Sequence, residues 1–338
     1  MWRDATNIYS LRLEFQSLTL RTESVQTRLR IGTRGSALAL AQTRAVIEAL
    51  ASAHHWEPEE ATAKTQIIPI KTTGDRVQDR PLADIGGKGL FAKEIEEALL
   101  AGEIDCAVHS LKDMPGALPP GLLIDCVLPR EDPRDAFVSK RAATLQDLPI
   151  GATVGTSSVR RQAMLLNTRP DLNIIGFRGN VDTRLQRIAQ DQVAATVLAL
   201  AGLKRLGAES NARHIFSEAE MLPAVAQGAI GIELRESDFA VRTAFAPVNQ
   251  RDAALAVTLE RAFLVVLDGS CKTPIAGLAK WLDPATISFS GCALSPDGKT
   301  RFDVARTATI ATAVDASKLG HDAGMELLAR AGRNFFQV

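Results

Sequence analysis

The sequence lacks the features that mark several large classes of protein. Its 338 residues carry 39 lysines and arginines against 39 acidic residues, so the formal net charge is zero. A chain without net charge is not attracted as a whole to nucleic acid or to an anionic membrane. No window holds the ~18 uninterrupted apolar residues of a membrane span. We therefore expect neither nucleic acid nor a membrane as a partner.

Cysteine and histidine are scarce and widely spaced. The four cysteines, Cys106, Cys126, Cys271 and Cys292, form no CxxC pair, and the five histidines form no HExxH pattern. A disulfide framework or a zinc site would need such spacing. The sequence therefore predicts no metal and no disulfide, and a cytoplasmic location fits this cysteine usage.

Residues 1–28 differ from the rest of the chain. They contain Arg3, Arg12, Arg21 and Arg28 with few acids and no compact apolar stretch, so they do not read as a secretory signal. Three interpretations remain: a disordered extension, an upstream start codon, or an organelle transit segment. We favour the first two.

From residue 29 onward, apolar strands alternate with helical patterns, which predicts an α/β fold with largely parallel sheets. Ser36 is placed to cap a helix that follows the first strand. A second α/β unit begins near Asp132, and a smaller α+β unit follows a helix that starts near Ala253. The expected strands are 29–33, 65–71, 104–111, 172–176, 194–200, 226–232, 287–294 and 301–309, and the expected helices begin at about 36, 90, 156, 180 and 253.

Arginines stand at the start of three predicted helices. Arg34 precedes Ser36, Arg160 and Arg161 follow the hydroxyl run 156–158, and Arg178 and Arg184 flank the helix start near Asn180. A helix N-terminus is already partly positive, so a cation there is unfavourable unless an anion compensates. Each arginine taken alone could equally reach solvent or pair with a nearby acid. The whole set favours a ligand that carries several negative charges.

Two further segments carry candidate chemistry. Lys112 and Asp113 directly follow a buried strand, where ligands bind in open α/β sheets, although Asp113 could also be an ordinary turn residue. Cys271 lies in a Gly/Ser/Pro loop beside Lys272, which favours the thiolate, while the other three cysteines read as core residues. Residues 86–89, Gly-Gly-Lys-Gly, fail the P-loop pattern and read as a mobile loop.

Ten motifs, taken in chain order, resemble the porphobilinogen deaminase family. Together they are very specific, and they extend from about Leu29 to near the C-terminus. They are Ile31–Leu40, Gly86–Phe91, Ala107–Pro115, Arg130–Phe137, Gly155–Gln162, Arg178–Arg184, Ala201–Gly207, Leu222–Ala229, Glu260–Leu264 and Gly269–Ile275. Two positions depart from the usual pattern: Ser270 and Ala226 stand where the family usually has glycine.

The resemblance implies two domains of the type II periplasmic-binding-protein fold and a small C-terminal α+β domain. On this basis we expect an N-terminal extension at 1–28, domain 1 at 29–128 and 229–246, domain 2 at 129–228, and domain 3 at 247–338. The active cleft would lie between the first two domains, and a monomer is expected.

The resemblance also implies the site. Cys271 matches the cysteine that holds a dipyrromethane cofactor through a thioether, and Asp113 matches the catalytic aspartate. Lys112, Arg34, Arg178 and Arg184 match residues that support catalysis, the last three also binding substrate together with Phe91. The expected cofactor contacts are Ser36, Thr156, Ser157, Ser158, Arg160, Arg161 and Arg205.

The implied activity is that of a transferase, hydroxymethylbilane synthase, of haem and chlorophyll (tetrapyrrole) biosynthesis. It would join four porphobilinogen molecules head to tail with loss of ammonia and then release hydroxymethylbilane by hydrolysis. Asp113 would stabilise the cation that forms when the aminomethyl arm loses ammonia. Two alternatives remain at this point. One is a dicarboxylate-binding protein of the same two-lobed fold, and the other is an inactive relative with a binding role.

Overall fold

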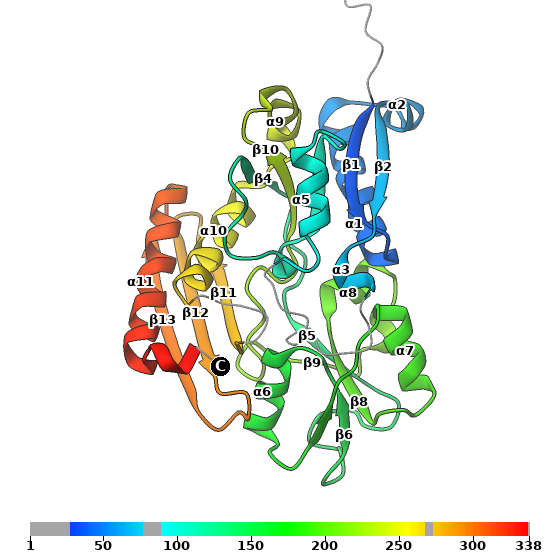
Figure 1. Ribbon diagram of the computed structural model, residues 1–338. Coiled ribbons are helices and arrows are strands. Elements are labelled where there is room, and N and C mark those ends of the chain that lie inside the picture. The colour runs from blue at the N-terminus through cyan, green and yellow to red at the C-terminus, as the bar shows by residue number, and fades with distance from the viewer. Residues whose placement is uncertain (1–27, 77–88, 268–272, 337–338) are drawn as a thin grey trace, which may run out of the picture.

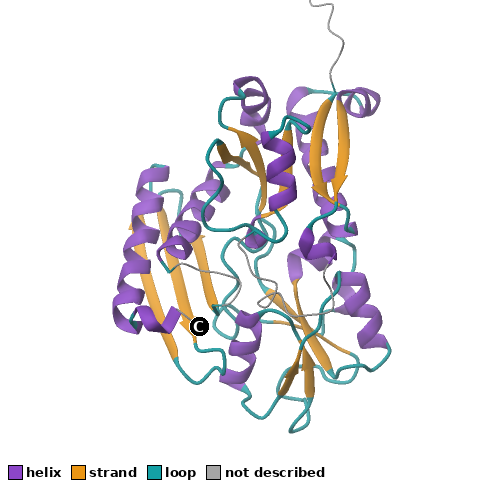
Figure 2. Ribbon diagram, in the orientation of Figure 1, coloured by secondary structure: helices purple, strands orange, loops and turns teal. Residues whose placement is uncertain are grey.

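The computed structural model describes residues 28–76, 89–267 and 273–336. They form two α/β lobes, one above the other, with a third, smaller sheet beside both (Figure 1). Helices cover the faces of the sheets (Figure 2). This arrangement confirms the predicted fold class of two α/β lobes and a small α+β unit. Among the described helices, none combines the length and the apolar character that crossing a membrane requires.

The first lobe is built on a five-stranded sheet. β1 is parallel to β2 and β3, whereas β10 is antiparallel to β3 and β4. In spatial order the strands are β2 (Thr65–Ile70), β1 (Leu29–Arg34), β3 (Cys106–Ser110), β10 (Ile230–Arg235) and β4 (Leu122–Val127). The helical segments are α1 (Ala37–His54), α2 (Pro58–Lys64), α3 (Thr73–Arg76), α5 (Lys93–Leu100), α9 (Phe239–Phe245), η1 (Leu111–Asp113) and η3 (Ala246–Val248).

The second lobe repeats this pattern with strands from the middle of the chain. β6 is parallel to β7 and β8, and β5 is antiparallel to β8. The strand order is β7 (Asn173–Ile175), β6 (Thr153–Gly155), β8 (Ala195–Ala199), β5 (Asp135–Ser139) and β9 (His214–Ile215). The helical segments are α6 (Val159–Thr168), α7 (Val181–Ala189), α8 (Leu200–Arg205) and η2 (Glu209–Asn211).

The third unit is an antiparallel sheet packed against two helices. Gly320 and Gly324 of the helix that follows the sheet lie against the helix that precedes it. A Cβ added at these glycines would meet Leu259 and Val266 of the preceding helix. Its elements are α10 (Arg251–Val266), β11 (Ile275–Trp281), β12 (Thr286–Leu294), β13 (Arg301–Thr309), α11 (Ala313–Ala331) and η4 (Arg333–Phe336). The β12–β13 turn also reaches the second lobe, where Nδ2 of Asn167 in α6 donates to the Gly298 carbonyl at 2.7 Å.

Two crossing segments join the lobes, and they lie against each other. The Glu131 N–H donates to the Gly228 carbonyl at 3.3 Å. Arg130 donates from Nε to the Gln227 carbonyl at 2.9 Å, and its other nitrogens bind the buried Glu260 of α10 at 2.6 and 3.1 Å. Because Glu260 also accepts from the Ala226 and Ala279 N–H groups, one carboxylate links both crossings to the third unit.

Several predicted elements need correction. The strand expected over 226–232 begins at Ile230, because Ala226 adopts a left-handed backbone with φ of 57° that an extended strand excludes. The helix expected from Thr156 begins at Val159 with Ser158 as its N-cap, and the helix expected from about Leu90 begins at Lys93. Strand β11 and helix α11 were not predicted.

Candidate active site

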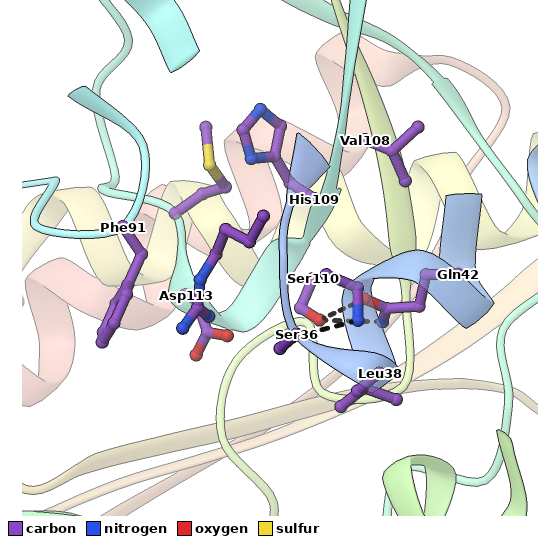
Figure 3. Close-up of a pocket in the computed structure, with 11 residues that line it drawn as sticks. Ser36, Leu38, Gln42, Phe91, Val108, His109, Ser110 and Asp113 are labelled. Carbon is purple, nitrogen blue, oxygen red and sulfur yellow. Dashed lines mark hydrogen bonds between the residues drawn. The ribbon is translucent and has the colours of Figure 1, made fainter. Parts of the chain in front are cut away.

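The site begins where two strands of the first lobe end. β1 leads through Arg34 into the Ser36 cap, whose Oγ accepts from the Ala39 N–H at 3.2 Å. β3 leads into the short η1 turn that carries Lys112 and Asp113. A pocket lies between these strand ends (Figure 3). Its lining residues are Arg34, Ser36, Leu38, Ala39, Gln42, Phe91, Val108, His109, Ser110, Asp113 and Met114.

Arg34 is held on two sides. Its guanidinium forms an ion pair with Asp75 and lies over the Phe91 ring, with 4.2 Å between Cζ and the ring centroid. A cation over an aromatic face is stabilised by the ring quadrupole. Burial alone would raise the pKa of Asp75, but hydrogen bonds from Arg34 and Thr72 lower it below the usual value. Arg34 is therefore fixed in the pocket beside Phe91.

Asp113 and Lys112 differ in exposure. Asp113 is exposed at the pocket, and no hydrogen bond fixes its carboxylate in the described part of the chain. Nζ of Lys112 donates to Oε1 of Gln227 at 3.3 Å. Burial lowers the pKa of Lys112 to about 8, an effect that Asp113 opposes and Arg161 strengthens. The turn thus presents a free carboxylate next to a lysine that can change charge near neutral pH.

Arg160 and Arg161 lie in the first turn of α6 and are both buried. They share one carboxylate, that of Asp135, with Arg160 at 2.7 Å from Oδ2 and Arg161 at 2.7 Å from Oδ1. Burial would raise the pKa of Asp135, but the two guanidinium groups hold it well below its usual range. The pairing with a nearby acid, one of the two interpretations left open, is present here. A contact to cofactor stays a prediction.

Arg178 and Arg184 bring further positive charge to the gap between the lobes. Nη2 of Arg178 donates across it to the Gly74 carbonyl at 3.3 Å. The pKa of Arg184 falls to about 10 because of burial and the neighbouring Arg161 and Arg178, while Asp113 opposes the change. Its Nε is buried and has no hydrogen-bond partner within the described residues. Arg184 of the second lobe therefore lies near the exposed Asp113 carboxylate of the first, and Arg178 contacts the first lobe at Gly74.

The remaining predicted contacts have local roles. Ser158 Oγ accepts from the Arg161 N–H, Thr156 Oγ1 from the Ser158 N–H, and Ser157 Oγ from the Phe177 N–H. Each hydroxyl keeps its own proton to donate. Arg205 donates through Nη2 to the Gly228 carbonyl at 2.7 Å, so it lies at the crossing between the lobes.

Cys271 lies outside the described residues, as does most of the glycine segment, 86–88. The other three cysteines, Cys106, Cys126 and Cys292, are buried as predicted. Burial raises the pKa of Cys126 and of Cys292 to about 12, so neither thiol forms a thiolate readily. Within the described part of the chain, no group of His, Cys, Asp and Glu side chains could hold a metal ion.

Sequence reasoning missed three polar residues that organise the site: Asp75, Asp135 and Gln227. Gln227 accepts from Lys112 and donates from Nε2 to Pro133 O and Asp135 Oδ1. Asp135 directly precedes an apolar run, and an acid at the start of a buried strand is a signal that a cation must be near. Nothing in the local pattern identified Asp75 or Gln227.

The surplus of cations over acids suits a carboxylate-bearing cofactor. Arg160 and Arg161 share a single carboxylate, and Arg184 has a buried nitrogen without a partner. A buried guanidinium N–H without an acceptor is unfavourable. The residues present therefore fit a group that brings its own carboxylates.

Two family models match consecutive parts of the chain. "Porphobilinogen deaminase, dipyromethane cofactor binding domain" matches residues 29–243, and "Porphobilinogen deaminase, C-terminal domain" matches residues 254–329. The chain belongs to the porphobilinogen deaminase family. This membership confirms the resemblance on which the predicted site depends.

Curated relatives agree with the family models over nearly their whole length. The porphobilinogen deaminase of Paracoccus denitrificans is 53% identical over 311 residues, which are 92% of this chain and 97% of the relative. That of Nitrobacter hamburgensis is 52% identical over 308 residues, 91% of this chain and 95% of the relative. The chloroplastic porphobilinogen deaminase of Oryza sativa is 51% identical over 91% of this chain and 85% of its own.

Solved structures of periplasmic binding proteins are more distant. The methionine-binding protein MetQ is 14% identical, with a TM-score of 0.42 over 76% of this chain and all of its own. A periplasmic substrate-binding protein of an ABC transporter from Coxiella burnetii is 15% identical, with a TM-score of 0.40 over 67% of this chain and 94% of its own.

Proposed function

We propose that this protein is a transferase that condenses four porphobilinogen molecules head to tail and releases hydroxymethylbilane for tetrapyrrole biosynthesis. Membership of the porphobilinogen deaminase family supports the activity. The structural observation that carries it is the exposed Asp113 carboxylate on one lobe, near the partly buried cation Arg184 of the other. An anionic substrate that develops a positive charge during reaction needs both kinds of group.

The cationic groups bind and orient the substrate. Porphobilinogen carries two carboxylates, and each addition brings two more to the growing chain. Arginine binds carboxylates through paired N–H groups, which fixes orientation as well as charge. In this proposal Arg34, Arg178 and Arg184 bind the substrate carboxylates, and Phe91 packs against the ring that Arg34 orients.

Asp113 acts where positive charge develops. When the aminomethyl arm of porphobilinogen loses ammonia, the remaining ring is a cation, and a nearby carboxylate stabilises it. The carboxylate then accepts the proton that the pyrrole must lose. Lys112 lies beside Asp113, where its charged form assists in holding the substrate carboxylates.

A dipyrromethane group bound to Cys271 through a thioether completes the site in this proposal. When bound, it supplies the pyrrole carbon to which the first substrate molecule is joined. Its carboxylates would be held by arginines and hydroxyls of both lobes. The residues proposed for this are Ser36, Thr156, Ser157, Ser158, Arg160, Arg161 and Arg205.

The domain limits, the oligomeric state and the location in the cell belong to the same proposal. We propose the domain limits of the sequence prediction, and the grouping of the strands into three sheets supports this division. We also propose a monomer and a cytoplasmic location. The family occurs in chloroplasts as well, as the name of the rice relative states.

Intact-mass measurement tests the function directly. The purified protein should be heavier than its sequence by one dipyrromethane, and added porphobilinogen should give a ladder of one to four further units. Cys271→Ser should lack the first adduct, while the control Cys292→Ala, at a buried cysteine, should keep it. A dicarboxylate-binding protein without catalysis would show the unmodified mass throughout, and that result would refute the proposal.

A further inference from the structure

A cluster of three ionisable side chains lies inside the first lobe, behind the turn that carries Asp113. His109 extends from β3, Glu233 from the neighbouring β10, and Glu96 from α5. These residues are 6%, 0% and 7% exposed. Burying ionisable groups is unfavourable unless they are paired. His109 also lines the pocket described above, whereas Glu96 and Glu233 do not, so the burial of these two carboxyl groups calls for a different explanation.

Glu233 is bonded to the strand that leads into the turn. Its Oε2 lies 3.0 Å from Nε2 of His109. In the β3–β10 ladder His109 faces Gly231 and Glu233 faces Ala107, so the two side chains are diagonal neighbours on one side of the sheet. His109 also lines the pocket that Asp113 lines (Figure 3). The pair therefore fixes the end of β3 directly ahead of the turn.

A second contact holds the chain behind the turn. Nη2 of Arg261 in α10 donates to the carbonyl oxygens of Pro115 and Gly116 at 2.8 and 3.0 Å. Burial lowers the pKa of Arg261, and the charge of Glu233 opposes this change. Glu233 thus stabilises the charged guanidinium that binds Pro115, while it also binds His109. It acts on both ends of the segment that contains Asp113.

Glu96 adds a second carboxylate to this cluster. Burial and the charge of Glu233 raise its pKa to about 7; His109 opposes this rise, and Glu97 of the same helix adds to it. Oε1 of Glu96 and Oε1 of Glu233 are both buried without a hydrogen-bond partner among the described residues. With both carboxyl groups ionised, two negative charges would repel each other in this buried part of the lobe. The arrangement is therefore most stable while one carboxylate is protonated.

We propose that Glu233 is a positioning residue for Asp113, and that the buried cluster of Glu96, Glu233 and His109 is most stable while Glu96 keeps its proton. The proposal rests on the proposed function, since Asp113 is catalytic only in that reaction. Glu233 touches no substrate in this scheme. Its loss should therefore change kcat much more than KM.

Thermal denaturation tests whether Glu96 keeps its proton, and this measurement does not require an active enzyme. We would compare the melting temperatures of the wild type, Glu96→Gln and the control Glu97→Gln at pH 5.5 and at pH 8.5. Glu97 is the next residue of α5, and its side chain is exposed. Between the two pH values Glu96→Gln should gain about 3 °C or more relative to the wild type. Glu97→Gln should keep a constant difference.

A kinetic measurement tests the positioning. Glu233→Gln should lower kcat by about tenfold or more with KM for porphobilinogen nearly unchanged, because small displacements of a catalytic group have effects of that size. The control Glu236→Gln, at an exposed residue just beyond β10, should match the wild type. If Glu233→Gln does not fold, His109→Leu removes the same contact from the other side, because leucine cannot donate a hydrogen bond, and this variant is measured in its place.

The outcomes separate this proposal from the function it rests on. A wild type that does not consume porphobilinogen refutes the function, and the stability arm still reports on Glu96. An active wild type with an equally active Glu233→Gln variant refutes the positioning role. If the difference in melting temperature between Glu96→Gln and the wild type is the same at both pH values, the proposal that Glu96 keeps its proton is wrong.

Discussion

Asp135 accepts a 2.7 Å hydrogen bond from Arg160, and both residues are buried. The same carboxylate also binds Arg161, so one negative charge faces two positive charges at the start of α6. Asp135 therefore aligns this pair but neutralises only one of its members. A ligand carboxylate next to the pair would neutralise the other.

Asp135→Asn should strongly destabilise the protein, because it leaves two buried guanidinium groups without a counter-ion. Breaking one side of a buried ion pair costs roughly 3–5 kcal/mol. Urea denaturation would measure this loss, with Asp322→Asn as the control. Asp322 pairs with Lys318 on the surface, where the loss should be much smaller than at Asp135. Equal effects of both changes would show that the Asp135 pair is not structural.

Asp113→Asn should lower kcat by about 100-fold or more, since a positioned carboxylate that handles charge and protons contributes on that scale. The carboxylate is exposed and has no hydrogen-bond partner in the described chain, so the melting temperature and the adduct mass should not change. Steady-state kinetics and intact mass check both points. Turnover close to that of the wild type would remove Asp113 from the mechanism.

Lys112 should give the enzyme an alkaline limit. Its charged form, which attracts carboxylates, is present below a pKa of about 8 and is lost as the pH rises through that value. The kcat/KM for porphobilinogen should therefore fall above about pH 8. In Lys112→Arg the limit should move upward, because arginine keeps its charge. Lys204→Arg, at an exposed ion pair with Glu131, serves as the control and should leave the profile unchanged.

The lowered pKa of Lys112 also makes the stability of the folded protein depend on pH. In the unfolded chain Lys112 binds its proton up to a pKa of about 10.5, whereas in the folded chain it loses it near 8. Between these values the unfolded state holds more protons, so this group makes the folded state more stable as the pH rises.

Ala226→Gly should stabilise the protein slightly, by up to about 1 kcal/mol, because alanine is strained in the left-handed region and glycine is not. Ala226 has φ of 57° and is the position where the family usually has glycine. Ala229→Gly, at a buried residue without positive φ, should instead destabilise the protein by a similar amount. Thermal denaturation of the two variants distinguishes them, and a loss of stability in both would argue against strain at Ala226.

Local signals predicted much of the fold. The caps Ser36 and Asn180 begin α1 and α7 as expected, because an N-cap bond joins residues three apart. α11 escaped prediction since Gly320 and Gly324 weaken its helical pattern, and the close packing on α10 that requires them is a tertiary feature.

The sequence predicted which residues of the candidate site would bind a charged ligand. It did not predict which residues of the protein these side chains bind. Arginines at helix starts predicted that anions bind there. The carboxylate that Arg160 and Arg161 bind in the structure is that of Asp135, which lies near them only once the sheet has folded. Glu233 left a signal that went unused. It is a charged residue inside the apolar run 230–234, a position that requires a buried partner.

The place of β10 in its sheet has a consequence for how the chain folds during synthesis. β10 lies between β3 and β4, so the first lobe lacks a central strand until residue 235 has left the ribosome. The second lobe is contiguous from β5 to β9 and is complete about 20 residues earlier. The second lobe begins later in the chain than the first but is thus complete before it, and the nascent first lobe keeps β3 and β4 unpaired with each other until β10 inserts between them.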